Sequence, residues 1–468
     1  MKSLEAYKNG VDGRCWQLYK TINSNRTCIP HIPSGKCSPI NVENIFVQGS
    51  CDAVLVAWPL MDSDSKRQGD CFSTEFCVDG ICINRMTFVD DLLGFDGSLI
   101  LADESNVVAE VFEKKSRLKY KISKCKVMPM NTKTPGVVVL NNVELEQVKE
   151  HVYLGTIVSA NGERHSDMKS RCSKANSVSN EIEQICKLPE LSQIRLNYSK
   201  LLMNSCLDRK VKFGCEFWDI MKYKGTTEKL DTIKPNLLKR ILELPASTPS
   251  TAIQYEFGVN DLTLEILMEK IIIGVETFKL DDSRISKRIL KALYEKSVPG
   301  FCTELNDACT VFDVSIERLM EVDDVRKMLK KKAVEIQGRE LLKRMVISSK
   351  MDRVLLGGFE YTGNMMKYLS ELKFCEARAI FMSRYRMWPT KENFHGRWTG
   401  NACNVCGLVD SDEHVLSCPG YEDILGNVKF DFDVFWDKEV LGDTEKLKTL
   451  ARIVIELVER MKDIQNLP

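Results

Sequence analysis

The sequence predicts an α+β protein with three parts. Short apolar runs separated by turn residues fill residues 1–160, which is typical of an antiparallel sheet with helices. Helical periodicity dominates residues 161–390, and four closely spaced Cys and His residues lie within residues 391–468. Since 468 residues are too many for a single core, we take these ranges as the predicted domains.

The composition excludes several classes of protein. Lys plus Arg and Asp plus Glu both number 66, so any nucleic-acid surface must be a local patch. No signal peptide follows Met1, and no run of about 18 apolar residues predicts a membrane span. We therefore expect an intracellular protein, cytoplasmic or nuclear, that is not secreted. Its 18 scattered cysteines favour reduced thiols and a metal site over a disulfide framework.

Turn chemistry organises the first part. Asp79-Gly80 and Asn141-Asn142 each lie between apolar runs, which predicts two hairpins. The expected elements are helices at 14–19, 51–62 and 105–118, strands at 42–47 and 152–158, and hairpins at 76–83 and 137–145. The apolar face of the helix at 105–118 would consist of Val107, Val108, Val111 and Phe112.

The second part is predicted to be helical. The expected helices cover 166–187, 201–217, 227–244, 262–278 and 323–345. Pro235 should interrupt the third of these, because proline lacks the N–H that a helix interior needs. The helix at 262–278 is apolar over several turns and is therefore expected to be buried.

An acidic pair lies between two apolar runs in residues 88–95. Asp90 and Asp91 would fall at the tip of a tight hairpin. Two neighbouring carboxylates raise each other's pKa, and a divalent cation removes that repulsion. Mg²⁺ commonly binds one or two carboxylates plus substrate phosphates, so the tip is a candidate metal site for phosphoryl transfer. The alternative is a solvated Asp-Asp turn.

A basic run follows the acidic hairpin. It consists of Lys114, Lys115, Arg117, Lys119, Lys121, Lys124 and Lys126. One interpretation is a phosphate-binding patch, suggested by its position just after the two carboxylates. The other is a solvated helix end and strand edge.

The pattern Cys403-x2-Cys406-x7-His414-x3-Cys418 is the second chemical signal. Two thiolates on a tight turn, followed by His and Cys about one helical turn apart, can complete a tetrahedron around Zn²⁺. Gly407 permits the turn after the first pair. We predict a structural zinc site here, against the alternative of four unrelated residues.

A mixture of basic and aromatic residues lies just before this element. It comprises Arg378, Phe381, Arg384, Tyr385, Arg386, Trp388, Lys391, Phe394, His395, Arg397 and Trp398. Base stacking and phosphate contacts use such side chains. The same mixture also describes an ordinary amphipathic helix and loop, so both interpretations stay open.

These motifs, in this order, resemble the reverse transcriptase region of non-LTR (LINE-type) retrotransposons. Phe88-Val89-Asp90-Asp91 is similar to the family's acidic hairpin, with Val in place of Ala. Residues 47–50 resemble its Gln-Gly motif, residues 118–126 its lysine-bearing palm segment, and residues 212–218 its thumb motif. The resemblance covers nearly the whole chain, and the Cys-Cys-His-Cys element also has the family's position.

The resemblance implies roles for particular residues. Asp90 and Asp91 would be catalytic and would bind Mg²⁺, and Lys124 would contact the triphosphate. Gln48-Gly49 would contact the nucleotide and template, and Tyr153-Leu154-Gly155 would hold the primer. The implied fold is a partial right-hand polymerase palm followed by a helical thumb. The implied partners are an RNA template, a DNA primer and deoxynucleotides.

One departure from the family bears on activity. The family has a further aspartate, in a Phe-Asp context before the Gln-Gly motif, that binds both metals. No Phe-Asp pair precedes Gln48, and Asp12 lies in a setting that resembles a turn. The chain is therefore expected to begin just downstream of that aspartate, and to lack the fingers.

Three functions follow from this comparison. The first is an incomplete RNA-directed DNA polymerase with little or no activity alone. The second is a non-catalytic, zinc-containing nucleic-acid-binding protein derived from a retroelement. The third is a degenerate element without a selected function.

Overall fold

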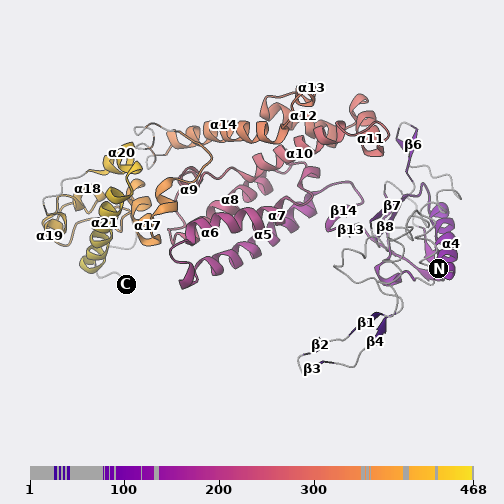
Figure 1. The fold of residues 1–468 in the computed structure, drawn as a ribbon, viewed down its shortest axis with the longest axis horizontal. Coiled ribbons are helices and arrows are strands. Elements are labelled where there is room, and N and C mark those ends of the chain that lie inside the picture. Colours follow the sequence, from indigo (N-terminus) through magenta and orange to yellow (C-terminus); the bar gives the residue numbers. More distant parts are fainter. Residues whose placement is uncertain are drawn as a thin grey trace. The chain divides into compact units, whose positions relative to one another are not determined.

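The computed structural model describes residues 26–28, 31–32, 35–36, 40–42, 77–78, 80–83, 85–88, 91–116, 119–130, 136–348, 351, 354, 358, 360–393, 400–426 and 431–465. The chain divides into two compact units (Figure 1). The first unit consists of residues 1–163 with 281–296, and the second of residues 164–280 with 297–468. Residues 391–468, expected to be separate, belong to the second unit.

Short strands paired two by two characterise the first unit. The antiparallel pairs are β1 (Arg26–Cys28) with β4 (Ile40–Val42), β2 (His31–Ile32) with β3 (Gly35–Lys36), β5 (Cys77–Val78) with β6 (Ile81–Cys82), β7 (Arg85–Phe88) with β8 (Asp91–Gly94), β10 (Val139–Leu140) with β11 (Val143–Glu144), and β13 (Glu150–Tyr153) with β14 (Thr156–Ser159). β9 (Lys126–Val127) and β12 (Glu146–Gln147) pair in parallel. The described strands thus form small ladders, where a larger antiparallel sheet was expected.

Both predicted turn signals are confirmed. Gly80, with φ of 73°, lies between β5 and β6. Asn141 and Asn142 have φ of 52° and 60° between β10 and β11. Two successive positive φ angles define a type I′ turn, which matches the twist of the strands that it joins.

The strand predicted at 152–158 is wrong, because the segment is a hairpin. Tyr153 ends β13 and pairs with Thr156 at the start of β14. Leu154 and Gly155 form the connection, with φ of 47° and 79°. A leucine gives no sign that it will adopt a left-handed conformation, so the apolar run concealed the turn.

Helices cover part of these strands. α4 (Leu99–Ser116) begins six residues before the predicted start, and η1 (Ile122–Lys124) is a single 3₁₀ turn. Ala109 packs with Val138, Leu140 and Leu145 in a small core. The predicted apolar face is wrong in part, because Val107 is exposed on α4. α11 (Ile285–Glu295) lies against β5 and β6.

Helices dominate the described part of the second unit, which also contains one isolated β-bridge, between Ala402 and Val409. Its α-helices are α5 (His165–Cys186), α6 (Arg195–Leu202), α7 (Asp208–Lys212), α8 (Lys224–Ile241), α9 (Ser250–Phe257), α10 (Leu262–Phe278), α12 (Phe301–Phe312), α13 (Ile316–Met320), α14 (Val325–Val346), α16 (Lys367–Glu371), α17 (Phe374–Arg384), α18 (Asp412–Val415), α19 (Glu422–Leu425), α20 (Lys438–Gly442) and α21 (Thr444–Gln465). The 3₁₀ turns are η2 (Pro189–Leu191), η4 (Cys215–Phe217), η5 (Pro419–Tyr421) and η6 (Phe432–Trp436).

Three predicted helices are confirmed almost to the residue, namely α5, α10 and α14. The helix predicted at 201–217 instead begins at Arg195, passes through the π-helical segment η3 (Met203–Leu207) and ends at Lys212. The predicted interruption at Pro235 is wrong, since α8 continues through it. Pro235 is buried between Ile233 and Leu237, so packing holds the helix where one hydrogen bond is missing.

The main core of the second unit joins its amino-terminal and carboxyl-terminal helices. α21 turns a stripe of apolar residues inward and packs on α17. The stripe consists of Leu447, Ala451, Val454, Leu457 and Met461. Elsewhere α10 and α12 approach closely at Gly274, where an added Cβ would lie 2.8 Å from Leu305.

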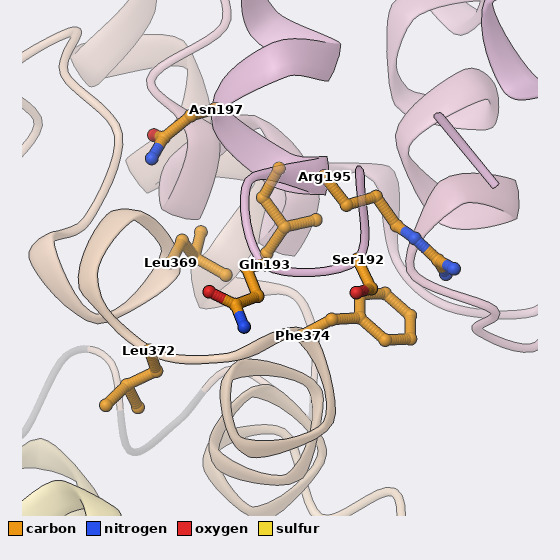
Figure 2. Close-up of a pocket in the computed structure, with 8 residues that line it drawn as sticks. Ser192, Gln193, Arg195, Asn197, Leu369, Leu372 and Phe374 are labelled. Atoms are coloured by element: carbon orange, nitrogen blue, oxygen red, sulfur yellow. The ribbon is translucent and has the colours of Figure 1, made fainter. Parts of the chain in front are cut away.

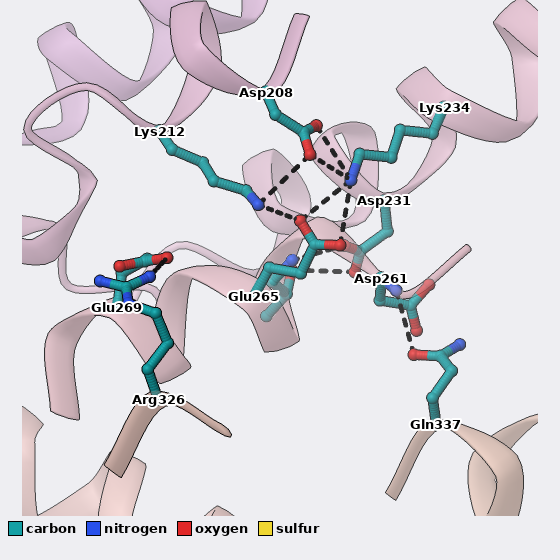
Figure 3. Close-up of polar contacts among 10 residues, drawn as sticks. Asp208, Lys212, Asp231, Lys234, Asp261, Glu265, Glu269, Arg326 and Gln337 are labelled. Carbon is teal, nitrogen blue, oxygen red and sulfur yellow. Dashed lines mark hydrogen bonds and ion pairs between the residues drawn. The ribbon is translucent and has the colours of Figure 1, made fainter. Parts of the chain in front are cut away.

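A group of ion pairs lies among α7, α8 and α10 (Figure 3). Lys234 lies 2.9 Å from both Asp208 and Glu265, and Lys212 pairs with the same two carboxylates. Nearby, the carboxylate of Asp231 accepts hydrogen bonds from the backbone N–H and the hydroxyl of Thr263. Two lysines and two carboxylates thereby neutralise one another where three helices meet.

From the sequence, we expect no membrane-spanning helix and reduced cysteines. Among the described helices, none combines the length and the apolar character that crossing a bilayer requires. The described cysteines include Cys125, Cys172, Cys186, Cys206, Cys215, Cys302, Cys309, Cys375, Cys403, Cys406 and Cys418, all of which are free thiols.

Candidate metal centre

A tight turn positions the first two candidate ligands. Ala402 and Val409 form a β-bridge, and the N–H of Cys403 donates to the carbonyl of Leu408, 2.6 Å away. The N–H of Gly407 donates back to the carbonyl of Cys403. Gly407 has φ of 77°, which glycine adopts without strain. The turn therefore directs the Cys403 and Cys406 thiols to one side.

A short helix and the segment that follows it supply the other two candidate ligands. The N–H of His414 on α18 donates to the side chain of Ser411, 3.1 Å away, which caps the helix. Cys418 follows after the helix has ended, in extended backbone just before Pro419. The cap fixes the start of α18, and the proline fixes the segment that carries the last thiol.

The structure brings the four predicted ligands together. All four ligand atoms lie within 4.8 Å of one another. The Sγ atom of Cys418 lies 3.8 Å from the Sγ atoms of both Cys403 and Cys406, and Cys406 Sγ lies 3.1 Å from His414 Nε2. Tetrahedral coordination with Zn–S bonds of about 2.3 Å separates two sulfurs by about 3.8 Å, whereas a disulfide requires about 2.05 Å. The group can therefore hold a metal ion.

The surroundings of the thiols differ. Burial and the neighbouring thiols raise the pKa of Cys418 to about 12. The pKa of Cys406, which is exposed, is lowered by a hydrogen bond from the backbone of Leu408. Metals bind the thiolate form. A divalent cation would therefore stabilise the charge that burial disfavours at Cys418.

Buried polar residues fasten this centre to its neighbours. Asp410 accepts hydrogen bonds from the backbone N–H of Lys391 and from Gln465 at the end of α21. Asn404, within the turn, donates to the carbonyl of Ile464, 3.1 Å away. Asp412 accepts from Asn393, 2.7 Å away. The candidate metal centre is thus bonded to the last helix and to the segment that follows α17.

The hairpin around the acidic pair is present, but only one of its acids is described. Phe88 pairs with Asp91 across β7 and β8, and Asp91 is exposed. Asp90 lies outside the described residues. Burial, and then the charge of Asp91, raise the pKa of Tyr153. No group of three metal-ligating side chains among the described residues includes Asp91.

The structure describes some of the other residues that were predicted to contact substrate. Gln48 and Gly49 lie outside the described residues. Lys124 ends η1 and is exposed, as are Lys119 and Lys121. Lys126 pairs with Glu146 instead of facing solvent alone. Leu154 and Gly155 form the turn between β13 and β14.

Most described residues of the basic and aromatic stretch are buried, which favours the interpretation as an ordinary helix and loop; Arg378, Arg386 and Lys391 are half-buried. Arg384 is buried against Glu256, and Arg378 donates to the carbonyls of Leu242 and Glu243. The rings of the stretch that are buried are Phe381, Tyr385 and Trp388. The residues at 394–399 lie outside the described part of the chain. Composition alone did not separate a buried helix from a binding surface.

A different aromatic pair is exposed, and it was not among the predicted site residues. Phe213 lies two residues before η4 and Phe217 ends it, and about half of each side chain is open to solvent. The adjacent Arg209-Lys210, also exposed, was an available signal. The predicted resemblance of residues 212–218 to a thumb motif did not indicate which of their rings face solvent.

A shallow depression on the surface offers no second site. It lies between the start of α6 and the loop before α17 (Figure 2). Its space is about 170 Å³ even with the part open to solvent, whereas ligand sites usually measure about 300–1,000 Å³. Arg195 fills one wall by stacking over Phe374 at 4.0 Å.

Comparison with known proteins does not identify a family for this chain. No protein-family model matches the sequence, and no curated protein matches it. Among the described residues, the best-defined group of potential ligands consists of Cys403, Cys406, His414 and Cys418.

Proposed function

We propose that this chain is a retrotransposon-derived reverse transcriptase segment that binds nucleic acid and does not copy it alone. The observation that carries the proposal is the group of three thiols and one imidazole at tetrahedral separations. It follows a helical unit and an acidic hairpin in the order that the resembled family has. The ancestral reaction implied by that resemblance is RNA-templated DNA synthesis from a primer 3′-hydroxyl.

The metal in this proposal is a structural Zn²⁺. Three thiolates and one imidazole are ligands that zinc prefers. Four protein ligands leave no open position for water or substrate, so the ion would have no catalytic role. Hydrogen bonds from Asn404 to Ile464 and from Gln465 to Asp410 would couple the loaded centre to the packing of α21.

Weak or absent polymerase activity follows from the acids that are available. In a two-metal site, ligands on both sides hold two ions about 3.5–4 Å apart. Asp90 and Asp91 are adjacent in the sequence, and no Phe-Asp pair of the kind that the resembled family has precedes Gln48. Phosphoryl transfer depends on such positioning, so Mg²⁺ at the hairpin alone would orient no in-line attack.

Primer extension tests the catalytic part of the proposal. The full chain, supplied with an RNA template, a DNA primer, deoxynucleotides and Mg²⁺ or Mn²⁺, should produce little or no extended product. Asp90→Ala is the control for contaminating polymerase. Robust synthesis that Asp90→Ala abolishes would overturn the proposed lack of activity.

Binding is tested separately. The full chain should bind labelled single-stranded RNA or DNA at low salt, with affinity that falls steeply as salt rises. The exposed cations Lys119, Lys121 and Lys124 would contribute to this binding. If the chain has no affinity for RNA or DNA even at low ionic strength, the nucleic-acid function is wrong.

A further inference from the structure

Two phenylalanine rings lie on the surface at the end of α7. Phe213 is 52% exposed and Phe217 is 48% exposed, whereas Cys215 and Trp218 between and beside them are fully buried. Gly214 makes the turn that separates the two rings, with φ of 75°. The buried pair anchors the segment and leaves about half of each phenylalanine side chain accessible.

The ring of Phe213 packs against the guanidinium of Arg171. The guanidinium carbon of Arg171 on α5 lies 4.9 Å from the centre of this ring. Asp167, which lies 3.9 Å from Arg171, accepts a hydrogen bond of 2.9 Å from the indole of Trp218. A buried chain of contacts thus joins the ring to the core, and this support reduces the entropy that Phe213 would lose on binding a ligand.

The ring of Phe217 has its own support. Its centre lies 6.0 Å from that of Phe301 on α12, with 46° between the planes. The Nζ atom of Lys270 lies 5.5 Å from the centre of the Phe301 ring and donates a hydrogen bond to the carbonyl of Trp218. Both exposed rings therefore rest on fixed neighbours.

Exposed basic side chains lie on the two helices that carry and support Phe213, and on the segment after η4. Arg209 and Lys210 are exposed on α7, one turn before Phe213, and α7 packs beside α5. Lys174 is exposed one turn beyond Arg171 on α5. Further along the chain, Lys222 and Lys224 are exposed.

Several nearby acids are already engaged within the protein. Asp208 pairs with Lys212 and Lys234, and Asp167 pairs with Arg171. The backbone N–H of Lys222 donates to Asp219. Glu216, within η4, is the acid that lies between the two rings in the sequence. On these segments the exposed cations therefore outnumber Glu216 and Asp219.

We propose that Phe213 and Phe217, with Arg209, Lys210 and Lys174, form a stacking platform for single-stranded RNA or DNA. The inference rests on the proposed function and assigns a site to it. Bases of any identity can stack on a phenylalanine face, and cations beside the rings can contact the phosphates between the bases. Charge complementarity favours a polyanion, and the exposed rings favour one that carries a flat aromatic base beside each phosphate.

Anisotropy of labelled dT15 and U15 with the full, zinc-loaded chain tests the platform. Phe213→Leu and Phe217→Leu keep the apolar volume and remove the ring, so each should weaken binding roughly tenfold. Phe213→Tyr and Phe217→Tyr should bind like the parent. Ile347→Ala, which removes an exposed side chain elsewhere, is the matched control and should change nothing.

The charge contribution has a separate readout. Arg209→Gln with Lys210→Gln should lower the slope of log affinity against log salt by about 0.7 per cation, whereas the Leu variants should leave the slope unchanged. Glu216→Gln should strengthen binding, because it removes the acid beside the rings. An abasic oligonucleotide of equal length should bind the parent no better than dT15 binds the Leu variants.

The outcomes separate this inference from the proposed function. If the parent binds no RNA or DNA at low salt, the proposed function fails. If the parent binds but the Leu variants bind equally well, or the abasic strand binds like dT15, the platform is wrong while the proposed function stands. Thermal unfolding of each variant, expected to match the parent because both rings are exposed, confirms that the comparison is between folded proteins.

Discussion

Nε of Arg384 on α17 lies 2.9 Å from Oε1 of Glu256 on α9, and both side chains are almost completely removed from solvent. The Tyr385 hydroxyl donates to the same carboxylate oxygen, 2.7 Å away. The Arg384 guanidinium also lies 3.7 Å from the centre of the Trp436 ring. This pair joins two helices that are 128 residues apart in sequence.

Replacing Arg384 should strongly destabilise the second unit. Arg384→Met leaves the carboxylate of Glu256 buried without its cation, which typically costs about 3–5 kcal/mol. Urea unfolding followed by circular dichroism measures the loss. Arg460→Ala, which breaks the exposed pair with Asp423, is the matched control and should cost less than about 1 kcal/mol. Equal effects of the two variants would contradict a structural role for the buried pair.

Metal removal should loosen the carboxyl-terminal part of the second unit. Cys406→Ser should lose the zinc that we expect at one ion per chain, as measured by elemental analysis. A loss of about 3 kcal/mol of stability, or roughly 6–12 °C in Tm, should accompany it. Cys375→Ser, which replaces another exposed thiol, should keep both the zinc and the Tm. A parent protein purified without any bound metal and unaffected by chelators would contradict this prediction.

Asp231 should make stability depend on pH. Burial, and then the charge of Asp261, raise the pKa of Asp231 to about 7 in the folded state, against 3.8 when it is unperturbed. The folded state therefore holds a proton that the unfolded state has released, so this group lowers stability as pH rises from about 4 to about 7.

Asp231→Asn tests this dependence. The amide can still accept the hydrogen bond from the N–H of Thr263 and carries no charge. The stability of the variant relative to the parent should therefore increase by about 1–3 kcal/mol between pH 5 and pH 8. Urea unfolding at several pH values measures the difference, and parallel curves for the two proteins would show that Asp231 does not titrate in this range.

Two glycines should respond to alanine in opposite ways. Gly274→Ala places a methyl group 2.8 Å from the side chain of Leu305, and such overpacking costs about 1–3 kcal/mol. Gly225→Ala, near the start of α8, meets no atom within 4 Å and should stabilise the helix by about 0.5–1 kcal/mol. Chemical denaturation of both variants checks the pair. Similar values for the two would mean that α10 and α12 do not approach closely at Gly274.

Local signals in the sequence predicted the features that depend on local chemistry. Asn141-Asn142 marks its own turn, and the apolar run at 262–278 marks a buried helix. The four metal ligands were predictable because a tight turn and a short helix place them within 16 residues. Leu154 gave no such signal, since its positive φ is imposed by the surrounding hairpin.

Long-range burial could not be predicted in the same way. From the sequence, Arg384 and Tyr385 could belong either to a phosphate-binding surface or to the core. The deciding contact is with Glu256, far away in the sequence, which pairs with Arg384 and accepts a hydrogen bond from Tyr385. The same limitation hid Phe213, whose exposure depends on Arg171 and on the helix beside it. Residue type predicts the kinds of contact that a side chain can make, whereas tertiary packing decides whether its partner is the protein or a ligand.

The place of α21 in the sequence has a consequence for how the protein is made. A ribosome synthesises α17 well before it reaches residues 444–465, so the surface that α21 will cover stays open during translation. Until α21 arrives, that apolar surface is available to chaperones and proteases. A premature stop codon that removes only this helix should therefore reduce the amount of protein in the cell severely, although it deletes no proposed ligand and neither exposed ring.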